Sequence, residues 1–110
     1  MSFRDFKLSE KDQNKEAWCE AVFGKKARFP REITEAQLCR LTTDLLIQHA
    51  RIIKESAEIV RTAEDIDTRL SRIEMMRMYY NDGMLRLKPF CNSEQLAMIS
   101  EAEEIIEKYD

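Results

Sequence analysis

A hydrophobic residue recurs at every seventh position through the middle of this 110-residue chain. The line runs through Leu38, Leu45, Ile52, Ile59, Ile66, Ile73, Tyr80 and Leu87. This spacing is typical of the core line of a coiled coil, and no Gly or Pro interrupts the chain between Thr34 and Gly83, so the pattern predicts a long helix over about 35–88. A second line, four residues further on, is small or polar at Thr42, His49, Ser56 and Ala63, which lets a neighbouring helix approach closely.

Two arrangements of this segment fit the pattern. In one, a single continuous or bent helix of about 50 residues runs through 35–88, and a second copy covers its hydrophobic face. In the other, the chain turns near 62–65, where Asp65 offers a second helix start, and two helices form a hairpin. A neighbouring line changes from hydrophobic to polar near residue 62, since it reads Cys39, Leu46, Ile53, Val60 and then Asp67, Glu74, Asn81, Lys88. The unbroken sevenfold phase and the absence of Gly, Pro and Asn at 61–68 favour the continuous helix, with the hairpin as the alternative.

Shorter segments flank the central one. The predicted boundaries are 1–8 for a flexible arm, 9–24 for a first helix, 25–33 for a basic linker, 34–88 for the long helix or hairpin, and 93–109 for an acidic last helix. Gly24 is expected to end the first helix, Pro89 to end the central segment, and Thr34 with Gln37 to form a capping box. The chain is therefore predicted to be one all-α domain, an elongated helical bundle.

Composition agrees with helices and bears on where the protein acts. Charged residues make up 35% of the chain, with only two glycines and two prolines, which is unusual for sheets joined by tight turns. No stretch approaches the run of about 18 to 20 apolar residues that spans a bilayer, and the first ten residues are too charged for a signal peptide. The three cysteines form no CxxC pair, so we expect reduced thiols in a cytoplasmic protein without membrane contact.

Common catalytic and ligand-binding motifs are missing from the sequence. It contains no GxGxxG, GxxxxGK[ST], GxSxG or HExxH motif, and no Glu-x-x-His pair of the kind used by di-iron bundles. Glutamates three residues apart are explained by ion pairs along helices. His49 is the only histidine and is interpreted as a packed structural residue. We therefore expect no enzyme activity, no cofactor and no metal site.

A short basic cluster in the linker is the feature that suggests nucleic acid. Lys25, Lys26, Arg28 and Arg31 surround Phe29, an arrangement in which basic groups meet phosphates while the ring stacks on a base. The chain carries a net charge of −3, however, and shows no recognition helix or basic stripe. Nucleic-acid binding is therefore the alternative function rather than the favoured one.

The segment IEMMRMYYNDG, residues 73–83, gathers three methionines and two tyrosines. On a helix, one face of it continues the sevenfold line, whereas Met75, Met78 and Tyr79 lie on another side. Either the chain's own last helix or a second copy is expected to cover that side. Methionine and tyrosine suit a surface that repacks or stays partly wet, so this segment is the candidate contact surface.

The favoured function is thus a non-enzymatic protein–protein interaction module. We predict that it forms a homodimer of coiled-coil type and binds an unidentified protein partner. The predicted partner-binding residues are Met75, Met78, Tyr79 and Tyr80. The acidic last helix, 93–109, is expected to set the orientation or the choice of the partner.

Overall fold

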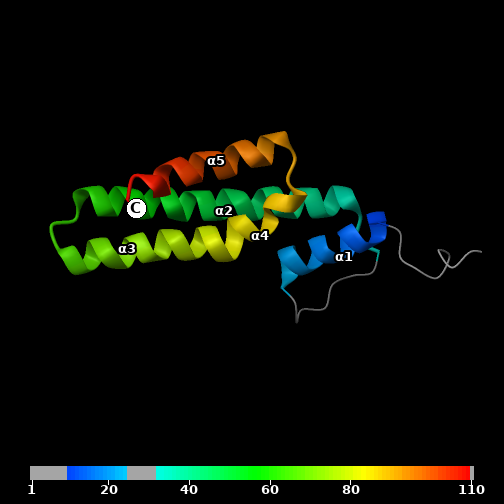
Figure 1. Ribbon diagram of the computed structural model, residues 1–110, viewed down its shortest axis with the longest axis horizontal. Helices are drawn as coiled ribbons and strands as arrows, with labels where there is room; N and C mark the ends of the chain where they lie inside the picture. Colours follow the sequence, from blue (N-terminus) through cyan, green and yellow to red (C-terminus); the bar gives the residue numbers. More distant parts are fainter. Residues whose placement is uncertain (1–9, 25–31, 110) are drawn as a thin grey trace, which may run out of the picture.

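Helices account for almost all of the chain that the structure describes (Figure 1). The computed structural model describes residues 10–24 and 32–109, of which 10–14 are described as backbone only. In chain order the elements are α1 (Glu10–Phe23), α2 (Glu35–Thr62), α3 (Ile66–Tyr79), the π-helical turn η2 (Tyr80–Met84), α4 (Leu85–Leu87), the 3₁₀ turn η3 (Lys88–Phe90) and α5 (Ser93–Glu107). The predicted capping box of Thr34 with Gln37 opens α2. No β-strand occurs in the described ranges, and the all-α prediction is confirmed.

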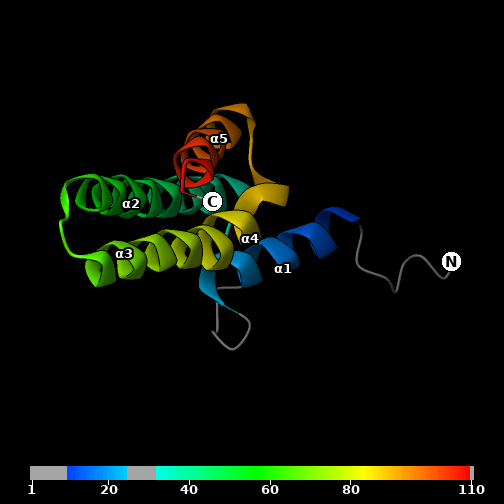
Figure 2. The same ribbon diagram turned by 60° about the vertical axis from the view of Figure 1, so that its left-hand side comes forward.

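α2 and α3 lie side by side and form a hairpin, as both views show (Figures 1 and 2). The chain turns at 63–65, where Ala63 and Asp65 have extended backbones with ψ of 134° and 126°. Asp65 then starts α3, because its carboxylate accepts hydrogen bonds from the backbone N–H of Thr68 (3.0 Å) and from the Thr68 hydroxyl (2.9 Å). The favoured prediction of one continuous helix over 35–88 is wrong, and the alternative hairpin is correct. An aspartate cap restarts a helix without Gly or Pro, so neither of these residues marks the turn in the sequence.

The helix α5 packs mainly on α2, with fewer contacts to α3 and η2, and completes a three-helix bundle (Figures 1 and 2). The core of this bundle consists of Leu46, Ile53, Val60, Met76, Met84, Leu87, Ile99, Ala102 and Ile106. α2 contributes the hydrophobic line that contains Ile53. The later α2 members of the sevenfold line, Leu45, Ile52 and Ile59, are only half-buried. The core is thus displaced by one position from the line that the sequence suggests, because the most buried side of α2 points between its two neighbours.

Polar contacts fix the direction of α5 relative to α2. Asn92 caps α5 and forms a capping box with Gln95. The buried Gln95 side chain also donates from Nε2 to the hydroxyl of Thr43, at 2.9 Å, near the start of α2. Beyond the end of α5, the Tyr109 hydroxyl donates to the carbonyl oxygen of Ala57, at 3.5 Å, near the end of α2. α5 therefore runs parallel to α2 and antiparallel to α3.

α1 packs at the end of the bundle where α2 begins (Figure 2). The indole N–H of Trp18 donates to the hydroxyl of Thr42 at 2.8 Å, and the Trp18 ring stacks on Phe90 with 6.1 Å between centroids. A second, smaller core lies here, made of Cys19, Ile33 and Leu38. Gly24, at φ 96°, ends α1 as predicted, since only glycine adopts this backbone without strain.

Candidate interaction surface

Met75 and Tyr79, two of the predicted partner-binding residues, turn their buried sides toward α2. The sulfur of Met75 lies 3.7 Å from the hydroxyl oxygen of Ser56. The Tyr79 ring lies against the imidazole of His49, with 5.6 Å between ring centroids. Met75 and Tyr79 therefore contact α2, which was not one of the two predicted covers for this face. Ser56 and His49 belong to the small and polar line of α2, and α3 is the neighbour that approaches it.

Tyr80 and Met78 have environments that differ from each other and from those of Met75 and Tyr79. The Tyr80 hydroxyl donates to Glu103 of α5 at 2.6 Å, and Lys88 donates to the same carboxylate oxygen at 3.2 Å. Burial and the nearby Glu103 raise the pKa of Tyr80 to about 12, while the hydrogen bond from Tyr80 lowers the pKa of Glu103. Met78, by contrast, is 52% exposed. The four predicted residues thus do not form one surface: Tyr80 holds α5 in place, and Met78 alone is largely free.

His49 lies directly against Gly83 in the π-helical turn η2. A Cβ atom added to Gly83 would lie 2.6 Å from Nε2 of His49, closer than any real contact of this kind. The imidazole therefore occupies the space that any other residue at position 83 would fill. The Nδ1 atom of His49 is buried and has no hydrogen-bond partner among the described residues. This arrangement supports the structural interpretation of His49, since the ring is packed between Tyr79 and the backbone of η2.

The burial of His49 predicts a pH-dependent stability. Burial lowers its pKa from the ordinary value of 6.5, so the unfolded chain takes up a proton at a pH where the folded chain does not. The free energy of unfolding should therefore be full above about pH 7 and fall between about pH 7 and pH 5. Urea unfolding at both pH values should show this loss in the wild type and a smaller one in His49→Gln. Equal losses in the two proteins would show that His49 is not its source.

The predicted basic cluster cannot be placed, and the described residues can be searched for metal sites and membrane spans. The basic residues Lys25, Lys26, Arg28 and Arg31 lie outside the described residues. Within 10–24 and 32–109, no group of three or more His, Cys, Asp or Glu side chains is arranged to hold a metal ion. None of the helices in these ranges is long and apolar enough to cross a membrane.

The most exposed large hydrophobic side chains in the described part of the chain are Ile66 and Leu70, on the first turns of α3. They are 68% and 56% exposed and stand four residues apart, so they form one strip on the helix. We call these two residues the hairpin-end strip. Other exposed hydrophobic residues, such as Leu85 and Leu96, have no exposed neighbour of this kind one turn away and are ordinary for a protein surface.

The hairpin-end strip continues the face of α3 on which α5 packs. Ile66 precedes Ile73 by seven residues, and Leu70 precedes Arg77 by seven, so each pair lies on one side of the helix. Ile73 packs against the core, and Nη2 of Arg77 donates to the backbone carbonyl of Tyr109, at 3.2 Å, just beyond α5. α5 ends too early to reach the strip. The same hydrophobic face therefore extends past the helix that covers it.

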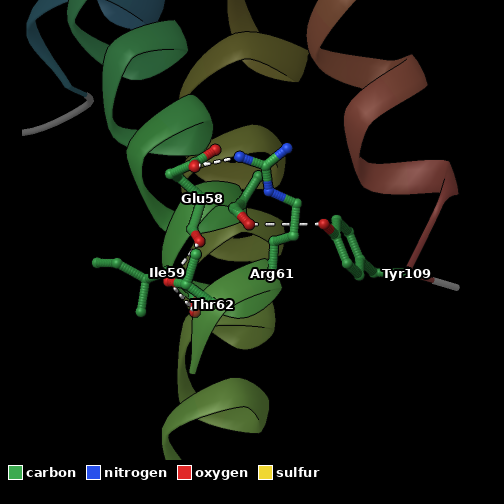
Figure 3. A network of polar contacts seen from close by, with 6 residues as sticks. Glu58, Ile59, Arg61, Thr62 and Tyr109 are labelled. Atoms are coloured by element: carbon green, nitrogen blue, oxygen red, sulfur yellow. Dashed lines mark hydrogen bonds and ion pairs between the residues drawn. The ribbon is translucent and has the colours of Figure 1, made fainter. Parts of the chain in front are cut away.

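Arg61 lies in the last turn of α2, near Tyr109, which follows the end of α5 (Figure 3). Its side chain is 70% exposed and pairs with Glu58 of the same helix. Arg61 follows Lys54 by seven residues, and the Lys54 ammonium forms an ion pair with Glu101 of α5 at 3.1 Å. The residue seven positions after Glu101 is Lys108, at which α5 ends, so Arg61 lies beside the end of α5.

Ile66 and Leu70 are not among the site residues predicted from the sequence. A continuous helix makes Ile66 a core position of the sevenfold line, so the pattern gives no reason to expect it on the surface. The signal that was available is Asp65, whose capping position allows a turn at 62–65. A turn there brings the first residues of α3 beyond the reach of a last helix as short as 93–109.

Comparison of the chain with models of known protein families, with curated proteins and with solved structures found no match in any of the three.

Proposed function

We propose that this protein is a non-enzymatic protein–protein interaction module that binds through the hairpin-end strip. The observation that carries the proposal is the uncovered continuation of the α5 face at Ile66 and Leu70. Burying a large aliphatic side chain stabilises a complex by about 1.5–3 kcal/mol, so two adjacent ones make a contact worth forming. The strip also lies on a helix whose start Asp65 caps, so its backbone is ordered before a partner binds.

Self-association belongs to the same proposal, since a second copy is one protein that could cover the strip. The sevenfold line of the sequence predicts a homodimer, and Ile66 is the member of that line that the bundle leaves most exposed. The proposed location is the cytoplasm, which fits the free thiols of Cys19, Cys39 and Cys91, because disulfides are rare there.

The test compares two matched double variants in affinity capture from the native host and in light scattering. Ile66→Ser/Leu70→Ser should weaken binding of a captured protein, or of a second copy, by at least about tenfold, equivalent to about 1.4 kcal/mol. The control, Leu85→Ser/Leu96→Ser, removes exposed hydrophobic side chains elsewhere and should bind as the wild type does.

A third variant, Met78→Ser, tests the face predicted from the sequence. The proposal requires that it bind as the wild type does, because Met78 lies away from the strip. If the wild type is monomeric and captures nothing that the hairpin-end variant loses, the interaction function at this surface is refuted. If Met78→Ser is the damaging change, the contact surface is the methionine face instead.

A further inference from the structure

Two of the three cysteines come together where the first turns of α2 meet the start of α5. Cys39 lies in the second turn of α2, on the line that enters the core at Leu46. Its sulfur accepts hydrogen bonds from Nδ2 of Asn92 at 3.7 Å and from Nε2 of Gln95 at 3.5 Å. Cys91 directly precedes Asn92, so the same contact brings the second cysteine next to the first.

The ionisation of Cys91 also reflects the presence of Cys39. Burial raises the pKa of the Cys91 thiol, and the charge of the neighbouring Cys39 raises it further. Cys91 is therefore a thiol at neutral pH, and its S–H group donates to the carbonyl oxygen of Leu87 at 3.1 Å. Cys39 and Cys91 are both partly exposed, whereas Cys19 is buried, so a small reagent in solution reaches the pair and not the third cysteine.

We propose that Cys39 and Cys91 form a reversible disulfide by exchange with a low-molecular-weight disulfide of the glutathione class. The Cys91 sulfur then leaves the carbonyl group of Leu87 and bonds to the Cys39 sulfur. Cys91 is suited to this movement, because it is a single residue of extended backbone between η3 and the cap of α5, at φ −86° and ψ 144°. This inference goes beyond the proposed interaction function and does not depend on it.

The exchange takes place in two steps. The thiolate of Cys39, whose sulfur already faces two amide donors, attacks one sulfur of oxidised glutathione, and the S–S bond of glutathione breaks. One reduced glutathione leaves with the proton that Cys39 has lost. The sulfur of Cys91 then attacks the mixed disulfide at Cys39, gives up its proton, and displaces the second glutathione. Two cysteine thiols are thus oxidised to one disulfide, and one oxidised glutathione is reduced to two thiols.

The disulfide would join the start of α5 covalently to α2. Gln95 already makes this connection by hydrogen bonds, from Nε2 to the carbonyl oxygen of Cys39 at 3.1 Å and to the hydroxyl of Thr43 at 2.9 Å. In a reducing cytoplasm the exchange runs in the opposite direction, and both thiols are free. The link therefore forms when oxidised glutathione accumulates, and it holds α5 on the hairpin under that condition.

The test treats the full-length folded protein with oxidised glutathione, blocks the remaining thiols and identifies cross-linked peptides by mass spectrometry. The Cys39–Cys91 link should exceed all links that contain Cys19 by at least about tenfold, and an excess of reduced glutathione should remove it. The same reaction in urea is the control for the fold. Loop closure alone favours Cys19–Cys39 over Cys39–Cys91 by roughly fourfold in an unfolded chain, so the preference should be lost there.

The consequence of the link is measured by thermal unfolding. Oxidation should raise the midpoint by about 5–15 °C in the wild type and in the matched variant Cys19→Ala, and should leave that of Cys91→Ser unchanged. Glutathione that stays on Cys39 or Cys91 without a cross-link would overturn the proposal, as would a dominant link to Cys19 or between two chains. A cross-linked protein with a lower midpoint than the reduced one would also overturn it, because the link would then distort the fold.

Discussion

Replacing Ile99 with alanine is expected to lower the free energy of unfolding by about 2–5 kcal/mol. Ile99 is fully buried in the main core, to which α2, α3, η2 and α5 all contribute side chains. Truncation removes three methyl and methylene groups from water-free contacts and leaves a cavity that α5, held at both ends, cannot close. A loss of this size should be visible in urea unfolding followed by circular dichroism.

Leu96→Ala is the matched control for this prediction. Leu96 stands on the same helix, three residues earlier, but is 38% exposed. Its truncation should cost less than about 1 kcal/mol, since much of the side chain already contacts water. Equal losses for the two variants would mean that α5 does not present the Ile99 side to the hairpin, and the three-helix bundle would be incorrect.

The contrast between Ile99 and Leu96 illustrates what hydrophobic spacing can tell. Both residues are hydrophobic and stand three positions apart on α5, a spacing that indicates one inward-facing side. Which residue of that face lies at its centre depends on the direction from which the hairpin approaches. That direction follows from the Gln95 and Tyr109 contacts with α2, which join residues about 50 positions apart and leave no periodic signal.

The hairpin turn was harder to predict for a related reason. The sevenfold line continues through Ile59, Ile66 and Ile73 without a break, although the first and last of these lie on different helices. The turn between the two capped helices has three residues, and this length happens to keep the sevenfold spacing of hydrophobic residues from α2 into α3. The better indicator of the turn was the neighbouring line, which changes from hydrophobic at Val60 to polar at Asp67. Val60 is buried on α2, whereas Asp67 lies on the exposed first turn of α3.

The candidate site was only partly predictable. Ile66 is exposed because the chain turns at 62–65 and α5 does not extend over the first turns of α3. The hydrophobic pattern of the sequence reveals neither feature. The methionine-rich segment, in contrast, attracted attention by composition. Its side chains pack in several directions, since Tyr79 contacts α2 and Tyr80 contacts α5. This explains why the segment is apolar over so much of its circumference.

The second large effect is expected at Gly83, where alanine should destabilise the wild-type protein. In a helix interior this change ordinarily stabilises by about 1 kcal/mol, because glycine has the greater freedom to lose. Here the added Cβ would lie 2.6 Å from Nε2 and 2.8 Å from Cδ2 of His49. Overpacking of this kind costs about 1–3 kcal/mol, so after the gain in helix propensity a net loss of up to about 2 kcal/mol is expected in urea unfolding.

The effect should reverse sign when His49 is removed. In the His49→Ala background the Cβ of residue 83 enters space that the imidazole has left, and only the gain in helix propensity remains. Gly83→Ala should then stabilise by up to about 1 kcal/mol, and the double-mutant cycle should give a coupling of about 1–3 kcal/mol. If alanine at position 83 has the same effect in both backgrounds, His49 does not lie against η2. A reversal of sign would show that position 83 requires glycine because the His49 imidazole fills the space of a side chain there. It would also show that the π-helical turn and the imidazole form one packing unit that holds α3 against α2.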